Sequence, residues 1–443
     1  MTMNHKKIFL FSAFAMCFSN VLLAQQTSYK FDFGTGKTAQ GYLNVLPETR
    51  FEDGKKYGFD FNAKVEGLNH KGKNALTTDG VKSEKPFYFS AAVPEGNYQV
   101  TVTLGDEKEP TSTTIKAESR RLMLENVNTK PGQFITKSFI VNIKDRNISG
   151  GQVVALKPRE LTKLDWDDKL TLEFDGRTVL AALEIKKVEK QITVFLAGNS
   201  TVVNQEDEPW ASWGQMIPRF FKPGVAIANH AESGLTLGSF MGSKRLSKVL
   251  SVMKPGDYLF VEFGHNDQKE KGPKDGPYKS YSERLRFFIS EAKKKGGIPV
   301  IVTSTSRRVF DSTGKIQNTL GDFPDAARKV AKEENVALID LNSMTAQLFN
   351  ALGEEQSKKA LVHYPANSYP GQDKPLADNT HFNPYGAYEI AQCVILGIKS
   401  QKLGLVKYLI DDLPDFDPAK PDDPLVWKWQ ESPGSSLVKP DGN

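Results

Sequence analysis

Hydrophobic and polar positions divide this chain into two parts with different periods. From about residue 28 to residue 190, short apolar or alternating runs are separated by polar turns, and no convincing helical pattern appears. The strand-like runs cover residues 31–33, 98–104, 139–143, 170–174 and 181–185. Many short strands with polar turns are typical of an all-β sandwich, and we predict a jelly roll for this half.

After about residue 190, apolar strands alternate with helical segments. The predicted strands are residues 192–197, 225–228, 258–263, 298–303 and 336–341. One predicted helix carries an apolar face made of Tyr281, Leu285, Phe288, Ile289 and Ala292. The last helix begins at Asn383-Pro384, a capping residue followed by proline at the first helical position. This alternation predicts an α/β domain in which helices cover both faces of five parallel strands, a three-layer α/β/α fold.

The N-terminus has the layout of a secretory signal peptide. Two lysines precede apolar runs at residues 8–18 and 21–24. Ser19 and Asn20 interrupt these runs, which leaves each of them too short for a membrane span. We therefore predict a bacterial signal peptide over residues 1–24 and a secreted or periplasmic protein.

The change of period near residues 187–191 marks the boundary between the two halves. The predicted parts are a β-sandwich over residues 27–188, an α/β domain over residues 191–410 and a C-terminal tail over residues 411–443. The tail is rich in proline and aspartate, and its Trp427 and Trp429 suggest that part of it packs on the body.

Composition and charge argue against several classes of function. The formal net charge of +5 falls by two, to +3, once Lys6 and Lys7 leave with the signal peptide. This balance, without a basic stripe of interleaved aromatics, argues against a nucleic-acid partner. No later stretch is long and apolar enough to cross a bilayer, and we expect a globular monomer. Cys393 lies in a helical pattern, where a small buried side chain is expected rather than a nucleophile.

Ligands of open α/β sheets bind beyond the carboxyl ends of the strands. The turns after the first two strands each offer a candidate residue. The first strand runs into Gly198-Asn199-Ser200-Thr201. Here Ser200 is either a nucleophile exposed at a sharp turn or an ordinary helix N-cap. The second strand leads towards Gly234, which either lets a backbone N–H approach a ligand or simply makes a turn.

Two further segments combine groups suited to proton transfer and hydrogen bonding. The third strand ends in Gly264-His265-Asn266-Asp267, where Asn266 can donate its amide and His265 either contacts a substrate or ties down the turn. In Asp378-Asn379-Thr380-His381, a carboxylate lies within reach of an imidazole, whose tautomer it would hold. His363 is an alternative base. The histidines show no zinc-type spacing, so we predict no metal and no cofactor.

Four motif blocks, taken in order along the chain, resemble those of the SGNH (GDSL-like) hydrolases. The blocks are Gly198-Asn199-Ser200, Gly234, Gly264-His265-Asn266-Asp267 and Asp378-x-x-His381. The resemblance covers about residues 191–405 and implies the flavodoxin-like SGNH hydrolase fold. Within the superfamily, the first and third blocks look like those of the rhamnogalacturonan acetylesterases (carbohydrate esterase family 12). The β-rich half is similar to the galactose-binding-like domains attached to many carbohydrate-active enzymes.

The resemblance implies a role for each of these residues. Ser200 would be the nucleophile, His381 the base and Asp378 its orienting partner. Gly234 and Asn266 would complete an oxyanion hole with the backbone N–H of Ser200.

One position departs from the family pattern. The family usually has aspartate before the serine, whereas this chain has Asn199, which keeps the shape and one acceptor but loses the charge. We place Asn199 and His265 among the substrate-binding residues and expect activity to survive the departure.

Basic residues near the site bear on the choice of substrate. Arg307 and Arg308 follow the fourth strand and are candidates to pair with the carboxylates of a pectin-like substrate. The lysines of the loop after the third block either do the same or form a solvated surface; they are Lys269, Lys271, Lys274 and Lys279. The predicted function is a secreted serine esterase that removes acetyl groups from a plant cell-wall polysaccharide, above all acetylated rhamnogalacturonan or another acetylated pectic polysaccharide or oligosaccharide.

Two other functions stay open on the sequence alone. One is a lipid or acyl-thioester hydrolase on the same scaffold. The other is an inactive carbohydrate-binding protein in which the β half does the work, where an aromatic such as Trp166 would stack on a sugar ring rather than fill the core.

Overall fold

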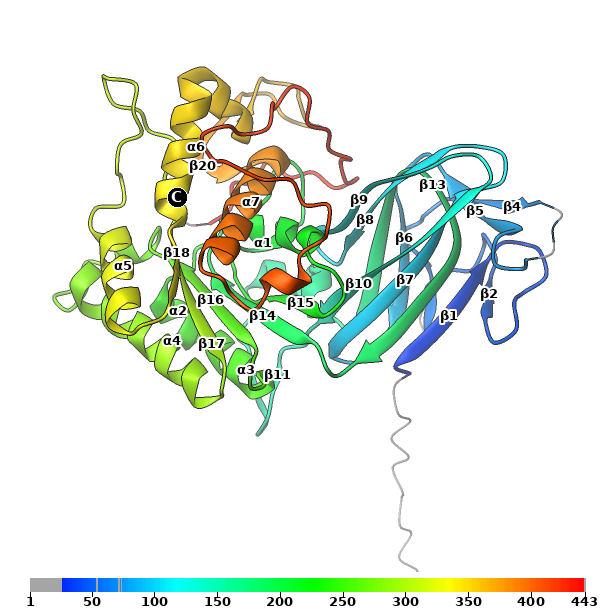
Figure 1. The fold of residues 1–443 in the computed structure, drawn as a ribbon, viewed down its shortest axis with the longest axis horizontal. Helices are drawn as coiled ribbons and strands as arrows, with labels where there is room; N and C mark the ends of the chain where they lie inside the picture. Colours follow the sequence, from blue (N-terminus) through cyan, green and yellow to red (C-terminus); the bar gives the residue numbers. More distant parts are fainter. Residues whose placement is uncertain (1–25, 53–54, 71, 73, 442–443) are drawn as a thin grey trace, which may run out of the picture.

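The computed structural model describes residues 26–52, 55–70, 72 and 74–441 as two bodies joined end to end (Figure 1). The first is built from strands, and the second from a central sheet surrounded by helices. This confirms the predicted order of an all-β part followed by an α/β part. The predicted signal peptide lies outside the described residues.

The strand-rich half consists of two sheets that share one long strand, β13 (Lys169–Val188). With the second half of β13, the first sheet contains β1 (Ser28–Phe33), β2 (Leu43–Val45), β4 (Glu66–Asn69), β5 (Asp79–Ser83), β7 (Gly96–Asp106) and β10 (Gln133–Ile143). With its first half, the second sheet contains β3 (Tyr57–Asp60), β6 (Phe87–Ala92), β8 (Thr111–Ala117) and β9 (Arg121–Thr129). Aromatic side chains fill the space between the sheets; Phe31 of β1, for example, meets Phe89 of β6 edge to face at 5.0 Å.

Strand β13 differs from the prediction, which treated residues 170–174 and 181–185 as separate strands. The polar residues between them do not form a turn, because Asp175 is buried against Lys116 of β8, with 3.0 Å between carboxylate and ammonium. The strand therefore continues and passes from one sheet into the other. Residues 189–191 connect it directly to the second half.

The second half contains a five-stranded parallel sheet in the order β15-β14-β16-β17-β18. Its strands are β14 (Ile192–Gly198), β15 (Val225–Asn229), β16 (Tyr258–Phe263), β17 (Ile298–Thr303) and β18 (Ala337–Ile339). In chain order this is 2-1-3-4-5, the flavodoxin-like arrangement, whose ligand crevice lies at the carboxyl ends beside the first strand. The predicted strands were correct apart from the last, which is shorter because Leu341 already begins a helix.

Helices cover both faces of this sheet, as predicted. On one face lie α1 (Trp213–Met216), α6 (Leu341–Gln356) and α7 (Pro384–Ser400). On the other lie α2 (Leu237–Gly242), α3 (Arg245–Val252), α4 (Ser282–Lys294) and α5 (Phe323–Glu333). Alternate residues of β14 serve the two faces, so that Leu196 packs with the first group and Phe195 with the second. Helix α7 begins at the predicted cap, where the Asn383 side chain accepts the N–H of Gly386 at 3.0 Å, and Cys393 is buried in this helix as predicted.

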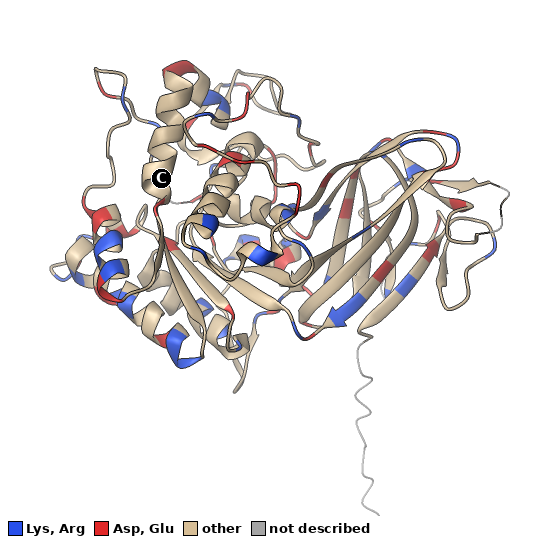
Figure 2. Ribbon diagram, viewed as in Figure 1, with Lys and Arg blue, Asp and Glu red and all other residues tan. Residues whose placement is uncertain are grey.

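Charged side chains gather on the outer helices of the second half, where blue and red segments alternate along α4 and α5 (Figure 2). Arg286 of α4 pairs with Glu333 of α5 at 2.7 Å on this surface. Such exposed pairs contribute little to stability.

The C-terminal segment runs from α7 back to the strand-rich half. Trp427 and Trp429 stack at 5.9 Å, and the Trp429 indole donates to Glu208 at 2.8 Å. The buried ammonium of Lys116 donates to the backbone oxygen of Gln430 at 2.7 Å. The segment therefore packs on both halves of the molecule.

Candidate active site

The structure brings Ser200, His381 and Asp378 together at the carboxyl end of β14. The Oγ of Ser200 lies 2.9 Å from Nε2 of His381, and Nδ1 of the same ring lies 2.8 Å from a carboxylate oxygen of Asp378. All three side chains are buried, with exposures of 4% or less. A serine, an imidazole and a carboxylate in this order can pass a proton from the hydroxyl to the ring.

The local backbone fixes the orientation of the Asp378 carboxylate. Asp378 lies on β20 (Leu376–Phe382), which pairs with β19 (Leu361–Tyr364) through an irregular register. One carboxylate oxygen accepts the backbone N–H groups of Thr380 and His381 at 2.7 and 2.9 Å, which leaves the other oxygen to face the ring. Burial alone would raise the pKa of Asp378, but the His381 ring and these N–H groups outweigh it and hold the pKa well below its usual range.

Trp210 supports the ring of His381 from the side. The two rings meet edge to face, with centroids 5.8 Å apart and planes at 86°. The backbone oxygen of Trp210 accepts from Arg120 of the strand-rich half at 2.9 Å. The first half of the chain thus helps to position the loop against which the imidazole packs.

Two predicted oxyanion donors, Gly234 and Asn266, lie next to each other. Gly234 has φ +81°, a conformation that favours glycine, and Asn266 donates one amide hydrogen to the backbone oxygen of Leu235 at 3.1 Å. Asn266 therefore holds the turn that presents Gly234. A carboxamide has two N–H hydrogens, and this bond uses one of them.

We expect Asn266→Ala to lower kcat by about 10²–10³-fold, the usual cost of losing one oxyanion donor, with a much smaller change in KM. Steady-state hydrolysis of 4-nitrophenyl acetate measures both constants. Asn128→Ala, at an exposed position on β9, is the control. A kcat close to that of the unmodified protein would remove Asn266 from the oxyanion hole.

Beneath the nucleophile, Asn199 belongs to a buried chain of polar groups rather than to an open surface. The Thr201 hydroxyl lies 3.0 Å from the Asn199 side-chain oxygen and 2.8 Å from the Glu262 carboxyl, and Trp213 donates to the other Glu262 oxygen at 2.6 Å. Burial raises the pKa of Glu262 to about 7, although the Trp213 and Thr201 hydrogen bonds oppose the rise. A protonated Glu262 can donate to Thr201, which then donates to Asn199, so an amide at position 199 fits a neutral chain.

We expect Asn199→Asp to destabilise the fold by about 1–3 kcal/mol at pH 8, because a second buried carboxylate would compete with Glu262 for a single hydroxyl hydrogen. The raised pKa of Glu262 favours folding at low pH, and this contribution is lost as the pH rises from the unfolded value towards about 7 and above. The penalty of the variant should therefore be larger at pH 8 than at pH 5.5.

Urea unfolding at the two pH values checks this prediction, with exposed Asn128→Asp as the control. An equal loss of stability at both pH values would contradict it.

The remaining predicted site residues lie in three different environments. His265 is buried, and burial, reinforced by Arg307 and His381, lowers the pKa of its imidazole well below the usual value, so the ring is neutral. Arg307 is partly exposed and its charge acts on Asp378, which places it beside the site.

Arg308 is instead used within the fold, because its guanidinium donates to Ser357, Asn379 and the backbone of Glu354. The structure does not present Arg308 to a ligand.

Two other candidates lie away from the nucleophile. His363 bonds Asn379 at 2.9 Å, whereas the ring that reaches Ser200 is that of His381. Trp166 is wedged between the two halves, with the Lys144 ammonium 4.6 Å and the Arg245 guanidinium 5.5 Å from its ring. It is partly buried and does not belong to the core of the sandwich.

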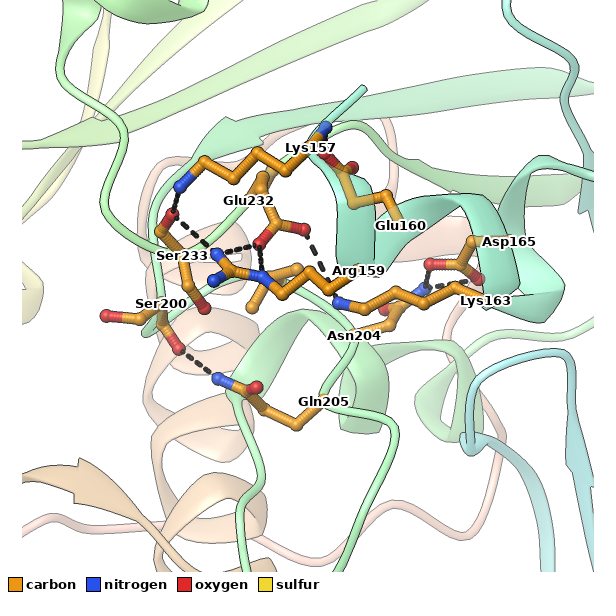
Figure 3. A network of polar contacts seen from close by, with 12 residues as sticks. Lys157, Arg159, Glu160, Lys163, Asp165, Ser200, Asn204, Gln205, Glu232 and Ser233 are labelled. Carbon is orange, nitrogen blue, oxygen red and sulfur yellow. Dashed lines mark hydrogen bonds and ion pairs between the residues drawn. The ribbon is translucent and has the colours of Figure 1, made fainter. Parts of the chain in front are cut away.

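Several residues of the site were not singled out from the sequence, among them Lys157 and Arg159. They precede β13, yet they contact Ser233 and Glu232 in the loop that carries Gly234 (Figure 3). They do not follow a predicted strand of the parallel sheet, so the sequence pattern did not mark them. They reach the Gly234 loop because the two halves of the molecule pack together. Within the described part of the chain, no group of three histidine, cysteine or acidic residues is placed to hold a metal ion, and no helix has the length and apolarity needed to cross a membrane.

Comparison with known proteins agrees with this architecture. Residues 196–387 match the GDSL-like Lipase/Acylhydrolase family, and residues 29–149 match the galactose-binding domain-like family of Beta-agarase/YXIM esterase-like proteins. The chain is 42% identical over 225 residues to the rhamnogalacturonan acetylesterase RhgT of Bacillus subtilis (strain 168), covering 50% of this chain and 96% of that protein. It is 28% identical over 405 residues to the uncharacterized esterase YxiM of the same organism, covering 87% and 95%. A crystal structure of Bacillus subtilis YxiM aligns with 26% identity and a TM-score of 0.45, covering 85% of this chain and 99% of that one.

The three-layer fold and these relatives make the protein an ester hydrolase of the carbohydrate esterase type. The chain belongs to the GDSL-like lipase/acylhydrolase family and carries an N-terminal galactose-binding-like domain. The predicted family and enzyme class are therefore confirmed.

Proposed function

We propose that this protein is a secreted serine esterase that removes acetyl groups from an acetylated cell-wall polysaccharide, acetylated rhamnogalacturonan or a related pectin. The observation that carries the proposal is the continuous hydrogen-bonded chain from Ser200 through His381 to Asp378. The 42% identity to a rhamnogalacturonan acetylesterase, over nearly its full length, supports the choice of substrate class.

The proposed reaction has two steps. His381 takes the Ser200 proton while Oγ attacks the acetyl carbonyl, and the N–H groups of Ser200 and Gly234 with the Asn266 amide stabilise the oxyanion. The sugar hydroxyl leaves with the proton held by His381. Water, activated by the same ring, then releases acetate from the acyl-enzyme.

Acetate release from acetylated rhamnogalacturonan, homogalacturonan and xylan tests the proposal, with Ser200→Ala as the control. We expect release from pectic substrates that requires Ser200. A series of 4-nitrophenyl esters of increasing chain length separates the lipase alternative, because an acetylesterase should prefer acetate and a lipid hydrolase longer acyl groups. Preference for long chains, or no acetate release from any glycan, would overturn the proposal.

A further inference from the structure

A cluster of basic side chains from the strand-rich half reaches the edge of the proposed oxyanion hole. Lys157 and Arg159 lie at the start of a short 3-10 helix (Pro158–Thr162) that precedes β13. The Lys157 ammonium donates to the backbone oxygen of Ser233 at 2.6 Å, and Arg159 donates to the same oxygen at 3.2 Å. Figure 3 shows both side chains extending towards the Ser233 loop, with Ser200 beside it. Because Gly234 is the next residue, these two cations border the site of the proposed reaction.

A buried carboxylate holds one of these cations in place. Arg159 makes bonds of 3.0 and 2.6 Å to one oxygen of Glu232, and Lys163 lies 3.4 Å from the other. Burial alone would raise the pKa of Glu232, but Lys163 and Arg159 outweigh it and keep the pKa below its usual range. Arg159 and Lys163 therefore both face this one buried anion. Lys157 contacts the Ser233 oxygen instead of Glu232, and Arg159 uses Nε and Nη2 for Glu232, which leaves Nη1 for another partner.

The Lys157 ammonium and Nη1 of Arg159 already bind a carboxylate, that of Asp441 near the C-terminus. One Asp441 oxygen lies 2.9 Å from the Lys157 ammonium and 2.7 Å from Nη1 of Arg159. A Cβ placed on Gly234 would lie 2.8 Å from the Cβ of Asp441, so the acidic side chain rests directly on that glycine. The cluster is thus a carboxylate site at the edge of the oxyanion hole.

The segment that carries Asp441 passes over the catalytic residues. Two residues earlier, the Lys439 ammonium lies 3.3 Å from the Asp378 carboxylate. The chain therefore crosses from the histidine side of the site to the glycine side. Both tail side chains are about half exposed, at 49% for Lys439 and 50% for Asp441, so a ligand in solution can compete with them.

We propose that Lys157 and Arg159 form a subsite for the carboxylate of a uronic acid residue of the substrate, and that Asp441 occupies it in the free protein. This inference rests on the proposed function and adds the residues that distinguish acidic from neutral glycans. Arg159 is held by Glu232 before the ligand arrives, so little side-chain freedom is lost on binding. A galactosyl or xylosyl residue carries no carboxylate and would gain nothing from these cations.

Binding of trigalacturonate and of neutral galactotriose, measured by titration calorimetry, tests the subsite without requiring turnover. We expect Lys157→Met to weaken trigalacturonate binding by about tenfold or more, the usual effect of losing one charged hydrogen bond, and to leave galactotriose binding unchanged. Lys157→Arg should restore most of the lost affinity. Asp441→Asn should strengthen trigalacturonate binding by roughly threefold or more, because the competing carboxylate is gone.

Exposed Lys332→Met and Asp412→Asn are the matched controls, and neither should change binding. Trigalacturonate affinity that is equal in the unmodified, Lys157→Met and Asp441→Asn proteins, or undetectable in all three, would overturn the subsite. Ser200-dependent hydrolysis of 4-nitrophenyl acetate is measured on the same preparations. An active esterase without Lys157-dependent binding would refute the subsite alone, whereas Lys157-dependent binding without esterase activity would refute the proposed function alone.

Discussion

Replacing Ser200 by alanine should lower kcat by about 10⁶-fold, and replacing His381 by alanine should lower it by a similar factor. The two side chains act as one unit, because the hydroxyl that attacks is the one whose proton the ring takes, across 2.9 Å. Once either is absent, the other has no function left to perform. The double variant should therefore lose no more activity than each single variant. The activity that remains comes from the oxyanion donors and substrate binding.

The measurement is kcat for 4-nitrophenyl acetate and acetylated pectin, with circular dichroism to verify folding. His363→Ala is the matched control for the histidine, because its ring bonds Asn379 and not the nucleophile. Exposed Ser290→Ala is the control for the serine. Near-normal activity in Ser200→Ala would refute the assignment of the nucleophile. A loss in His363→Ala as large as that in His381→Ala would refute the assignment of the base.

Much of the second half could be predicted from the sequence because buried parallel strands are continuous apolar runs. Strands β16 and β17 have the predicted bounds for this reason. The long strand β13 could not be predicted, since its middle is polar. Asp175 is accommodated by Lys116, a residue of another strand, and a partner so far away in sequence leaves no local pattern.

Some residues of the candidate site could likewise be predicted from the sequence, and others could not. Ser200 and His381 follow from motifs that stand at strand ends in a fixed order. Arg308 stands at a similar place in the sequence, yet the fold uses its donors for Ser357 and Asn379. Lys157 and the tail residue Asp441 reach the site only because separate parts of the chain pack against it. The periodicity of apolar residues along the sequence does not predict such contacts.

Asp378→Asn should lower kcat by about 10⁴-fold while leaving substrate binding nearly unchanged. The backbone N–H groups of Thr380 and His381 require an acceptor, so the amide oxygen of asparagine must take the place of the bonded carboxylate oxygen. The amide NH₂ is then forced to face Nδ1 of His381 and donates to it. This holds the ring with its hydrogen on Nε2, the atom that has to accept the Ser200 proton.

The same substitution should change stability in a direction set by pH. Because the folded pKa of Asp378 lies below its unfolded value of about 3.9, the carboxylate stabilises the fold above that pH and loses its effect as the pH falls further. The unmodified protein should thus exceed Asp378→Asn in unfolding free energy at pH 7, and the gap should narrow below about pH 4. Urea unfolding across this range measures the gap, with exposed Asp412→Asn as the control. A gap that stayed constant down to pH 3, together with normal kcat, would mean that the Asp378 charge neither orients His381 nor supports the fold.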